Sequence, residues 1–237
     1  MSDQSLSDQI ALITGASRGI GAATSKSLAA RGAHVILVAR TVGGLEETEE
    51  AIHAAGGSAT IAPLDLADGD SIGRLAAAIG ERWGRLDILV LNAAMLGALA
   101  PVPSIDAKEF GRLLTLNVGA NQALIAAFDP WLRQSKKPRM VAVTSSVGAS
   151  PRAYWGGYGA SKAALETLAL AYADEMEGLG DLRVAIVDPG ATATAMRKDA
   201  FPGEDPATLK QPSVVGEAIA DLLASDFATG SRIRVES

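Results

Sequence analysis

Short apolar runs alternate along the chain with longer segments in which apolar residues recur every three or four positions. Continuous apolar runs are typical of strands buried on both faces, and the longer segments are typical of amphipathic helices. The predicted strands are Ile10–Thr14, His34–Ala39, Ser58–Leu64, Leu86–Leu91, Met140–Ser145, Arg183–Val187 and Arg232–Val235. The predicted helices cover residues 19–31, 42–55, 68–83, 105–134, 158–178 and 212–224.

Strands that alternate with helices predict a parallel sheet with helices on both faces. Because crossovers between parallel strands are right-handed, we expect the sheet to be doubly wound. We therefore predict an α/β fold, a Rossmann-like doubly wound sandwich with a seven-stranded parallel sheet. No repeat or linker interrupts the alternation, and 237 residues suit a single domain over residues 1–237. Only Gly190–Pro212 lacks clear periodicity, and we expect a functional or mobile loop there.

Composition argues against several classes of function. Hydrophobic residues make up 48% of the chain and charged residues 20%, so a large buried core is available. A net charge of −6 without a basic stripe argues against nucleic-acid binding. No apolar run approaches the roughly 20 residues that span a bilayer, and the polar start lacks the apolar stretch of a signal peptide. The chain has no cysteine and two scattered histidines, so we expect a cytoplasmic protein without a metal site.

A glycine-rich turn, TGASRGIG at residues 14–21, follows the first predicted strand and opens the first predicted helix. Such a turn lets the backbone approach a pyrophosphate, which the helix N-terminus then attracts. An NAD site would place an acid at the end of the second strand, but this chain has Arg40 there. Arg40, with Arg18 in the turn, suits the 2′-phosphate of NADP. The pair therefore favours NADP (NADPH) over NAD, although either arginine is alternatively a solvated surface charge.

Tyr158 and Lys162 stand four residues apart at the start of a predicted helix, and therefore on one face of it. A positive charge roughly 5 Å from a phenol favours the phenolate by about 3 kcal/mol at an effective dielectric of about 20. We therefore expect Lys162 to lower the pKa of Tyr158 and make it a general acid and base. Ser145 and Ser146 lie beside the pair, at the end of the preceding predicted strand.

Taken together, these motifs resemble the short-chain dehydrogenase/reductase family over about residues 8 to 225. The resemblance also includes Asp65 after the third strand, Asn92-Ala93-Ala94 after the fourth, Asn117 in the long helix and Asp188-Pro189-Gly190 after the sixth. It implies that Tyr158 exchanges a proton with the substrate oxygen, assisted by Lys162. Ser145 is favoured over Ser146 as the hydrogen-bond donor to that oxygen, because it stands three residues before a glycine as in the family.

The resemblance also implies further roles. Asn117 would hold a water that links Lys162 to solvent, and Asp65 would accept a bond from the adenine, unless it caps the next helix. The implied catalytic set is Asn117, Ser145, Tyr158 and Lys162. The implied cofactor-binding set is Gly15, Ser17, Arg18, Gly19, Ile20, Gly21, Arg40, Asp65, Leu66, Asn92, Ala93, Ala94, Tyr158, Lys162, Pro189, Gly190, Thr192 and Thr194.

Some positions depart from the family pattern. Ala94 replaces a usual glycine, which puts the cofactor fit in doubt, and the sequence stops soon after Gly230, which puts a tetramer in doubt. Residues 105–134 and 158–178 remain available for a dimer, so we expect a homodimer or a homotetramer. The segment Ala195–Gln211 is short, so we expect an open substrate pocket.

The sequence thus predicts an NADP(H)-dependent oxidoreductase that interconverts a carbonyl and an alcohol. An uncharged, moderately hydrophobic substrate is suggested by Met95, Leu96, Tyr154, Trp155 and Met196, which are alternatively core or interface residues. A ketone, a 3-oxoacyl thioester, a sugar and a quinone all remain open. One alternative is a dinucleotide-sensing regulatory protein without turnover, although such a protein would not need Ser145, Tyr158 and Lys162. An NAD(P)-dependent isomerase or dehydratase would generally carry a larger C-terminal region.

Overall fold

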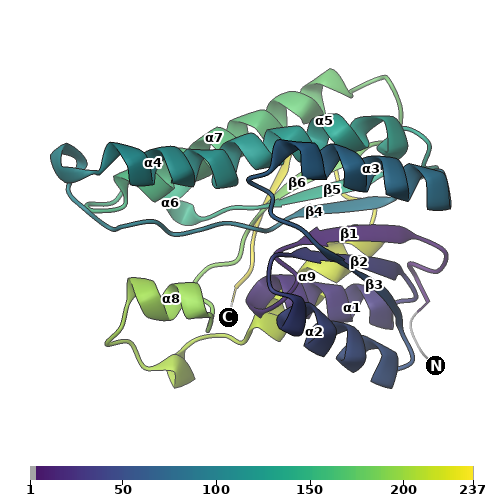
Figure 1. The fold of residues 1–237 in the computed structure, drawn as a ribbon, viewed down its shortest axis with the longest axis horizontal. Coiled ribbons are helices and arrows are strands. Elements are labelled where there is room, and N and C mark those ends of the chain that lie inside the picture. Colours follow the sequence, from purple (N-terminus) through teal and green to yellow (C-terminus); the bar gives the residue numbers. More distant parts are fainter. Residues whose placement is uncertain (1–3, 237) are drawn as a thin grey trace.

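The computed structural model describes residues 4–236, which form a single-domain Rossmann-like fold around one parallel sheet. Its strand order is β3-β2-β1-β4-β5-β6-β7, so the chain reverses its direction of travel across the sheet between β3 and β4 (Figure 1). The strands are β1 Ile10–Thr14, β2 His34–Ala39, β3 Ser58–Pro63, β4 Ile88–Leu91, β5 Arg139–Val143, β6 Arg183–Asp188 and β7 Ser231–Arg234. Both the predicted fold class and the seven-stranded parallel sheet are confirmed.

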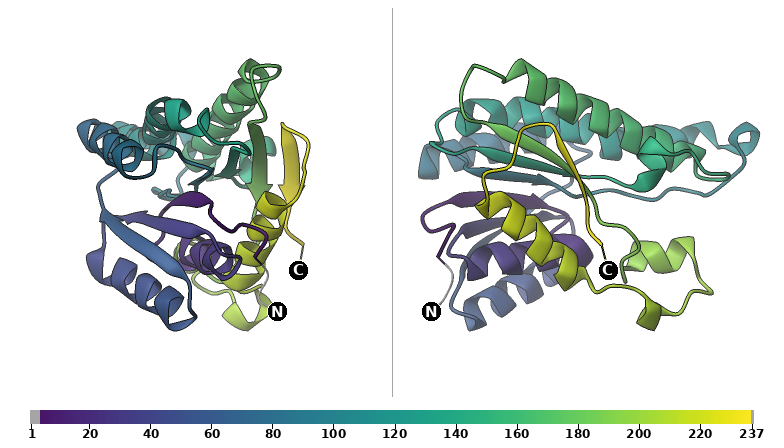
Figure 2. Two further views of the ribbon diagram at one scale, coloured as in Figure 1. Left: turned by 90° about the vertical axis from the view of Figure 1, so that its right-hand side faces the viewer. Right: turned by 180° about the vertical axis from the view of Figure 1, so that it is seen from behind.

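Helices cover the sheet in two layers (Figures 1 and 2). One layer holds α1 Gly19–Ala30, α2 Val42–Ala54 and α9 Pro212–Ala224. The other holds α3 Gly69–Trp83, α4 Ala107–Leu114, α5 Ala120–Leu132 and α7 Gly156–Glu175. Each face buries its own apolar cluster: Leu28 and Ile219 pack under the first layer, and Phe128 and Leu165 under the second. The inner strands β1, β2, β4, β5 and β6 are buried between the two layers, which explains why they read as continuous apolar runs. The edge strands β3 and β7 are more exposed.

Three segments differ from the predicted elements. The predicted helix at 105–134 is α4 and α5 joined by a π-helix, Thr115–Gly119. The strand β5 ends at Val143, and Ser145 instead precedes the four-residue helix α6, Ser146–Ala149. Within the segment predicted as a loop, α8 covers Ala195–Ala200 and lies apart from both helical layers in Figure 1. Two short 3-10 helices complete the chain, Val102–Ser104 and Pro206–Thr208.

The N-cap of α8 explains why a helix begins inside a segment without periodicity. The hydroxyl of Thr194 accepts a hydrogen bond of 3.2 Å from the backbone N–H of Arg197, which satisfies one of the free donors of the first turn. Arg197 then pairs with Glu204 beyond the helix. Local hydrogen bonds and an ion pair therefore order this segment without an amphipathic pattern. Across residues 4–236, no helix is both long and apolar enough to cross a membrane.

Candidate active site

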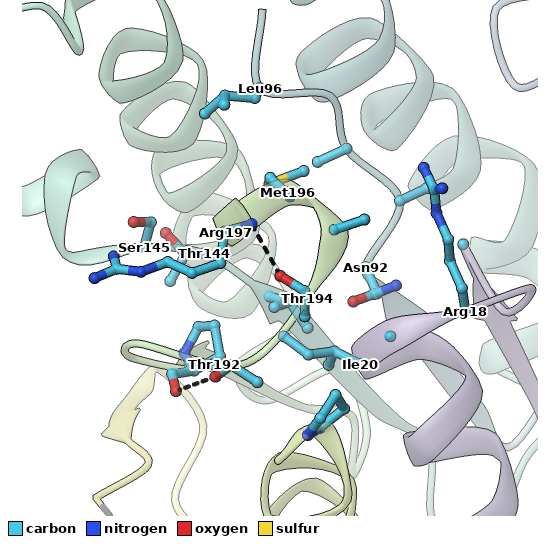
Figure 3. A pocket seen from close by; sticks show the side chains of 18 of the residues that line it. Arg18, Ile20, Asn92, Leu96, Thr144, Ser145, Thr192, Thr194, Met196 and Arg197 are labelled. Atoms are coloured by element: carbon cyan, nitrogen blue, oxygen red, sulfur yellow. Dashed lines mark hydrogen bonds between the residues drawn. The ribbon is translucent and has the colours of Figure 1, made fainter. Parts of the chain in front are cut away.

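One cleft of about 1020 Å³ gathers the predicted cofactor and catalytic residues. In doubly wound sheets such clefts lie at the carboxyl ends of the strands, where the strand order reverses. In Figure 3, Arg18 and Ser145 stand on opposite sides of the view, with Thr194 and Met196 between them. The predicted residues that line the cleft are Gly15, Ser17, Arg18, Gly19, Ile20, Arg40, Asp65, Leu66, Asn92, Ala93, Ala94, Ser145, Tyr158, Lys162, Pro189, Gly190, Thr192 and Thr194.

The glycine turn between β1 and α1 is tightly packed and lines the cleft. Gly15 has a φ of 69°, which disfavours any side chain. A Cβ on Gly21 would lie 2.2 Å from the Gly15 carbonyl oxygen and 2.6 Å from Asn92 Nδ2. Among the described residues, the side chain of Arg18, the N-cap residue of α1, makes no capping hydrogen bond. Gly19 and Ile20 of the first turn line the cleft. This arrangement fits a phosphate.

Asn92 holds β4 against β1 immediately behind this turn. Its side-chain amide donates a 2.8 Å hydrogen bond to the Thr14 carbonyl oxygen. The Thr14 hydroxyl accepts hydrogen bonds of 3.0 Å from the backbone N–H groups of Asn92 and Ala93. Asn92 therefore fixes the spacing of β1 and β4 next to the cleft. Its side chain also packs close to the glycine turn, since a Cβ on Gly15 would lie 2.8 Å from Asn92 Nδ2.

The ends of β2 and β3 form the other end of the cleft. Arg40 and Arg18 are both exposed there, and Glu47 also lines this end. Asp65 accepts a 3.0 Å hydrogen bond from the backbone N–H of Ala67, so its carboxylate shapes its own turn. Asp68, rather than Asp65, occupies the N-cap position of α3, and its side chain makes no capping bond. The alternative in which Asp65 caps that helix is therefore wrong.

Tyr158 and Lys162 occupy the third and seventh positions of α7 and line the cleft together. Lys162 Nζ lies 5.7 Å from the centre of the Tyr158 ring and donates a 2.9 Å hydrogen bond to the Val143 carbonyl oxygen. The Tyr158 hydroxyl contacts Met196 Sδ at 3.8 Å. The tyrosine ring is thus buried at the cleft with its hydroxyl toward α8.

The electrostatics of Tyr158 differ from the sequence-based expectation. Burial, followed by the negative charge of Asp188, raises the pKa of Tyr158 above its ordinary value of 10. Burial also lowers the pKa of Lys162 to about 8, against the opposing effect of Glu166. The expected lowering of the Tyr158 pKa by Lys162 is therefore wrong for this structure. Desolvation of a buried phenolate dominates its titration, while the ammonium is bonded to a main-chain carbonyl.

A buried carboxylate that sequence analysis missed ties α7 to the residue after β5 and to β7. Glu166, one helical turn beyond Lys162, accepts hydrogen bonds from the Thr144 hydroxyl and from the Arg232 guanidinium. Along the chain, Thr144 stands between Val143 and the half-buried Ser145, and the Val143 carbonyl oxygen accepts the hydrogen bond from Lys162. Glu166 therefore fixes the backbone on which Ser145 stands. A glutamate four residues after the lysine was the available sequence signal, but nothing in the pattern named its partners.

Asn117 lies behind the cleft and does not line it. Its side chain is fully buried, accepts from the Met95 N–H at 2.9 Å, and donates to the Met95 carbonyl and to the Ser161 hydroxyl. The Asn117 carbonyl oxygen accepts a 2.8 Å hydrogen bond from Asn121. In this structure Asn117 therefore connects the segment after β4 to α7, and its predicted link between Lys162 and solvent stays a prediction.

The strand-loop junction after β6 completes the cleft. Gly190 has a φ of 62°, and its backbone faces Lys210, whose ammonium bonds to the Val235 carbonyl oxygen. The buried Thr192 donates its hydroxyl to the Pro189 and Gly190 carbonyl oxygens. This compact turn sets the position from which Thr194 starts α8 along the cleft.

Comparison with known proteins assigns this arrangement to a family. A model of the short chain dehydrogenase family matches residues 9–205, most of the chain. The chain belongs to the short-chain dehydrogenase family.

Relatives match this short-chain dehydrogenase along nearly its whole length. The uncharacterized oxidoreductase YciK of Escherichia coli K12 is 36% identical over 224 residues, 93% of this chain and 88% of that protein. Cis-4-hydroxycyclohexanecarboxylate dehydrogenase of Sinomonas cyclohexanicum is 30% identical over 235 residues, 95% of this chain and 93% of that protein. A structure assigned as a short chain dehydrogenase from Shigella flexneri 2a, complexed with NADP, has a TM-score of 0.91 at 35% identity, with 99% of each chain covered.

Not every residue singled out from the sequence lies in the cleft of this short-chain dehydrogenase. Leu96, Trp155 and Met196 line it, as does Ser146. Gly21 supports the turn from behind, and the Tyr154 side chain is 60% exposed and not among the lining residues. Missed lining residues include Arg152 and Arg197. Their only sequence signal was a positive charge close to the serine–tyrosine motif or inside the unpatterned segment. In residues 4–236 there is no group of three or more potential metal-ligating side chains.

The lowered pKa of Lys162 predicts how the stability of this short-chain dehydrogenase depends on pH. The unfolded chain holds the lysine proton up to the ordinary value of 10.5, whereas the folded protein releases it near 8. Between these values the unfolded state binds more protons, so stability rises with pH there and is lower below pH 8. Relative to a Lys162→Met variant, we expect wild type to gain roughly 3 kcal/mol across that window. Urea unfolding of both proteins without nucleotide, at several pH values, measures this, and parallel pH dependences would contradict it.

Proposed function

We propose that this protein is an NADP(H)-dependent oxidoreductase that interconverts a carbonyl and an alcohol. One observation carries the proposal: Ser145, Tyr158 and Lys162 line the same cleft as the glycine turn between β1 and α1. A dinucleotide held on the turn would extend along the strand ends toward a hydroxyl, a phenol and an ammonium. No regulator of nucleotide level needs that set of groups at the reacting end.

The chain's residues fit NADP. Gly15 and Gly21 let the turn pack closely against Asn92, because a Cβ on either would lie only 2.8 Å or 2.6 Å from Asn92 Nδ2. The side chain of Arg18, the N-cap residue of α1, makes no capping hydrogen bond among the described residues. Arg18 and Arg40 flank the position where the ribose phosphate of NADP would lie, and no acid stands at the end of β2. The Shigella relative, complexed with NADP, supports the same choice. When bound, this cofactor supplies hydride chemistry at the nicotinamide.

Tyr158 is proposed as the group that donates a proton to the substrate oxygen. Because burial raises its pKa, the phenol stays protonated at neutral pH, which suits the acid that carbonyl reduction requires. Ser145 would donate a hydrogen bond to the same oxygen as negative charge grows on it. Lys162 would orient Tyr158 and help to return a proton to its hydroxyl. Asn117 would position the part of α7 next to Lys162 through its hydrogen bond to Ser161.

The substrate class follows less directly from the relatives. The Sinomonas protein is named for a hydroxy compound, which supports an alcohol and carbonyl pair for this chain, whereas YciK is uncharacterized. Leu96, Trp155 and Met196 give the reacting end apolar walls. The direct test is an absorbance screen at the reduced-nicotinamide band against ketones, aldehydes and oxoacyl thioesters with NADPH and NADH. Failure to oxidise either cofactor with every carbonyl would count against the proposal.

Replacing Arg40 by Asp tests the cofactor choice. The new carboxylate would repel the 2′-phosphate of NADPH and accept a bond from the free ribose hydroxyl of NADH. We expect NADPH affinity to fall by about 10-fold or more, equivalent to about 1.4 kcal/mol, while NADH affinity holds or improves. Calorimetric titration with both cofactors measures the ratio, and Lys108→Asp, an exposed charge change on α4 away from the cleft, is the control. A ratio that is unchanged in Arg40→Asp would remove Arg40 from phosphate recognition.

The proposal also includes a cytoplasmic location and self-association. The absence of cysteine supports the first, because a reducing compartment gives no role to disulfides. The helical layer that contains α4, α5 and α7 is the surface that we propose for a homodimer. The segment after Gly230 would decide whether two such dimers form a homotetramer.

A further inference from the structure

The substrate end of the cleft combines an aromatic wall with positive charge. The Trp155 ring meets the Tyr158 ring edge to face, with 5.9 Å between ring centres. The Trp155 ring also stacks with Phe201, with 5.7 Å between ring centres and an interplanar angle of 30°. Phe201 follows α8, so this stack joins the segment before α7 to the segment after α8. An apolar substrate body beside Tyr158 would contact this wall.

Two guanidinium groups lie against the same stack, and they differ in their partners. Arg197 lies 3.8 Å from the Phe201 ring centre, and Glu204 holds it in a two-pronged ion pair with both N–O distances at 2.6 Å. Arg152 lies 5.3 Å from the Phe201 centre and 6.0 Å from the Trp155 centre. Within residues 4–236, Arg152 has no carboxylate at ion-pair distance and its side chain donates no hydrogen bond. Its charge is therefore available to a ligand.

The backbone around Arg152 is held in an unusual conformation. Tyr154 has a φ of 71°, in the left-handed region that costs a non-glycine residue about 1 kcal/mol or more. The Trp155 N–H donates to the Arg152 carbonyl oxygen, and the Ala100 N–H donates to the Tyr154 carbonyl oxygen, both at 3.1 Å. The exposed Tyr154 side chain gains no burial from this turn. The residues on either side of it in this turn, Arg152 and Trp155, both line the cleft.

Arg152 is also separate from the proposed phosphate-binding residues. Arg18 and Arg40 belong to the β1–α1 turn and the end of β2, whereas Arg152 stands between Ser145 and Tyr158 in the chain. Of its aromatic neighbours, Trp155 contacts Tyr158 and Phe201 stacks on Trp155. A negative group bound to Arg152 would therefore belong to the substrate, not to the ribose phosphate of the cofactor.

We propose that Arg152 binds a carboxylate on the substrate, whose apolar body lies along Trp155 toward Tyr158. This inference rests on the proposed function, since it names the substrate class of the same cleft. It also revises the uncharged substrate expected from the sequence. The exposed guanidinium of Arg152 lies within 6.0 Å of both ring centres, and a planar guanidinium matches a carboxylate with two parallel hydrogen bonds. The substrate is thus an apolar oxo acid or hydroxy acid.

Paired ligands that differ only in charge test this site. Benzoate, cyclohexanecarboxylate and octanoate, each with its own amide, are titrated calorimetrically into the protein saturated with NADP⁺. We expect wild type to bind at least one acid about 10-fold or more tighter than its amide, as a charge-assisted pair predicts. In Arg152→Gln the ratio of acid affinity to amide affinity should fall to about 1. Lys198→Gln, which removes an exposed charge on α8 that does not line the cleft, should keep the wild-type preference.

The outcomes separate this inference from the proposed function. A wild-type protein that binds no acid better than its amide overturns the inference, as does a preference that survives in Arg152→Gln. Loss of the preference in Lys198→Gln as well would overturn it too, because general charge would then explain it. NADPH oxidation with uncharged ketones but no acid preference would leave the proposed function standing alone. An acid preference without turnover of any carbonyl would support the anion site and count against the oxidoreductase.

Discussion

Replacing Tyr158 by Phe is expected to lower kcat for carbonyl reduction by roughly 100-fold or more and to leave NADPH affinity nearly unchanged. The variant keeps the ring that packs beside Trp155 and Lys162, so the shape of the cleft is retained. It loses the hydroxyl, whose raised pKa keeps a proton available at neutral pH. The loss therefore falls on proton donation and not on binding.

Tyr172→Phe is the matched control for this prediction. Tyr172 lies on the same helix, donates a 2.7 Å hydrogen bond to Asp129 and does not line the cleft. Its loss should lower stability by about 1 kcal/mol and leave kcat close to wild type. Steady-state kinetics and calorimetric NADPH titration on the three proteins provide the comparison. Near-normal turnover in Tyr158→Phe would remove this residue from the mechanism.

Gly21→Ala is expected to weaken NADPH binding by about 10- to 100-fold and to destabilise the protein by about 1–3 kcal/mol. The new Cβ would stand 2.2 Å from the Gly15 carbonyl oxygen and 2.6 Å from Asn92 Nδ2. Neither neighbour can retreat cheaply, because one is backbone of the turn and the other holds β1 to β4. The turn itself must move, and the phosphate cradle moves with it.

Gly43→Ala separates this effect from a general cost of added methyl groups. Gly43 lies in α2 beside Gly44, which lines the cleft, and a Cβ on Gly43 would meet no atom of the described residues within 4 Å. Alanine in a helix should leave NADPH affinity unchanged and stabilise the protein by about 0.4–1 kcal/mol. NADPH titration and urea unfolding of both variants measure the two effects. Wild-type affinity in Gly21→Ala would mean that the turn tolerates displacement.

The sequence alone determined the fold and the identity of most cleft residues. Continuous apolar runs indicate strands that are buried on both faces. The spacing of apolar residues in a helix or strand follows from the local backbone geometry, so it can be recognised without knowing the tertiary contacts. The predicted strands Ile10–Thr14 and His34–Ala39 match β1 and β2 at both ends. The glycine turn and the serine, tyrosine and lysine motif could be located because their spacing along the chain is fixed by a turn or by one helical repeat.

The tertiary structure decided how those residues are charged and what surrounds them. The spacing along the helix places Lys162 near Tyr158. Tertiary packing then buries both side chains and places the ammonium of Lys162 against the Val143 carbonyl oxygen. Because burial destabilises the phenolate, the pKa of Tyr158 is raised and not lowered as expected. The stack of Trp155 and Phe201, with the guanidinium of Arg152 close to it, joins segments separated by α7, β6 and α8. Desolvation and long-range contact depend on atoms brought from elsewhere in the chain, and no local pattern encodes them.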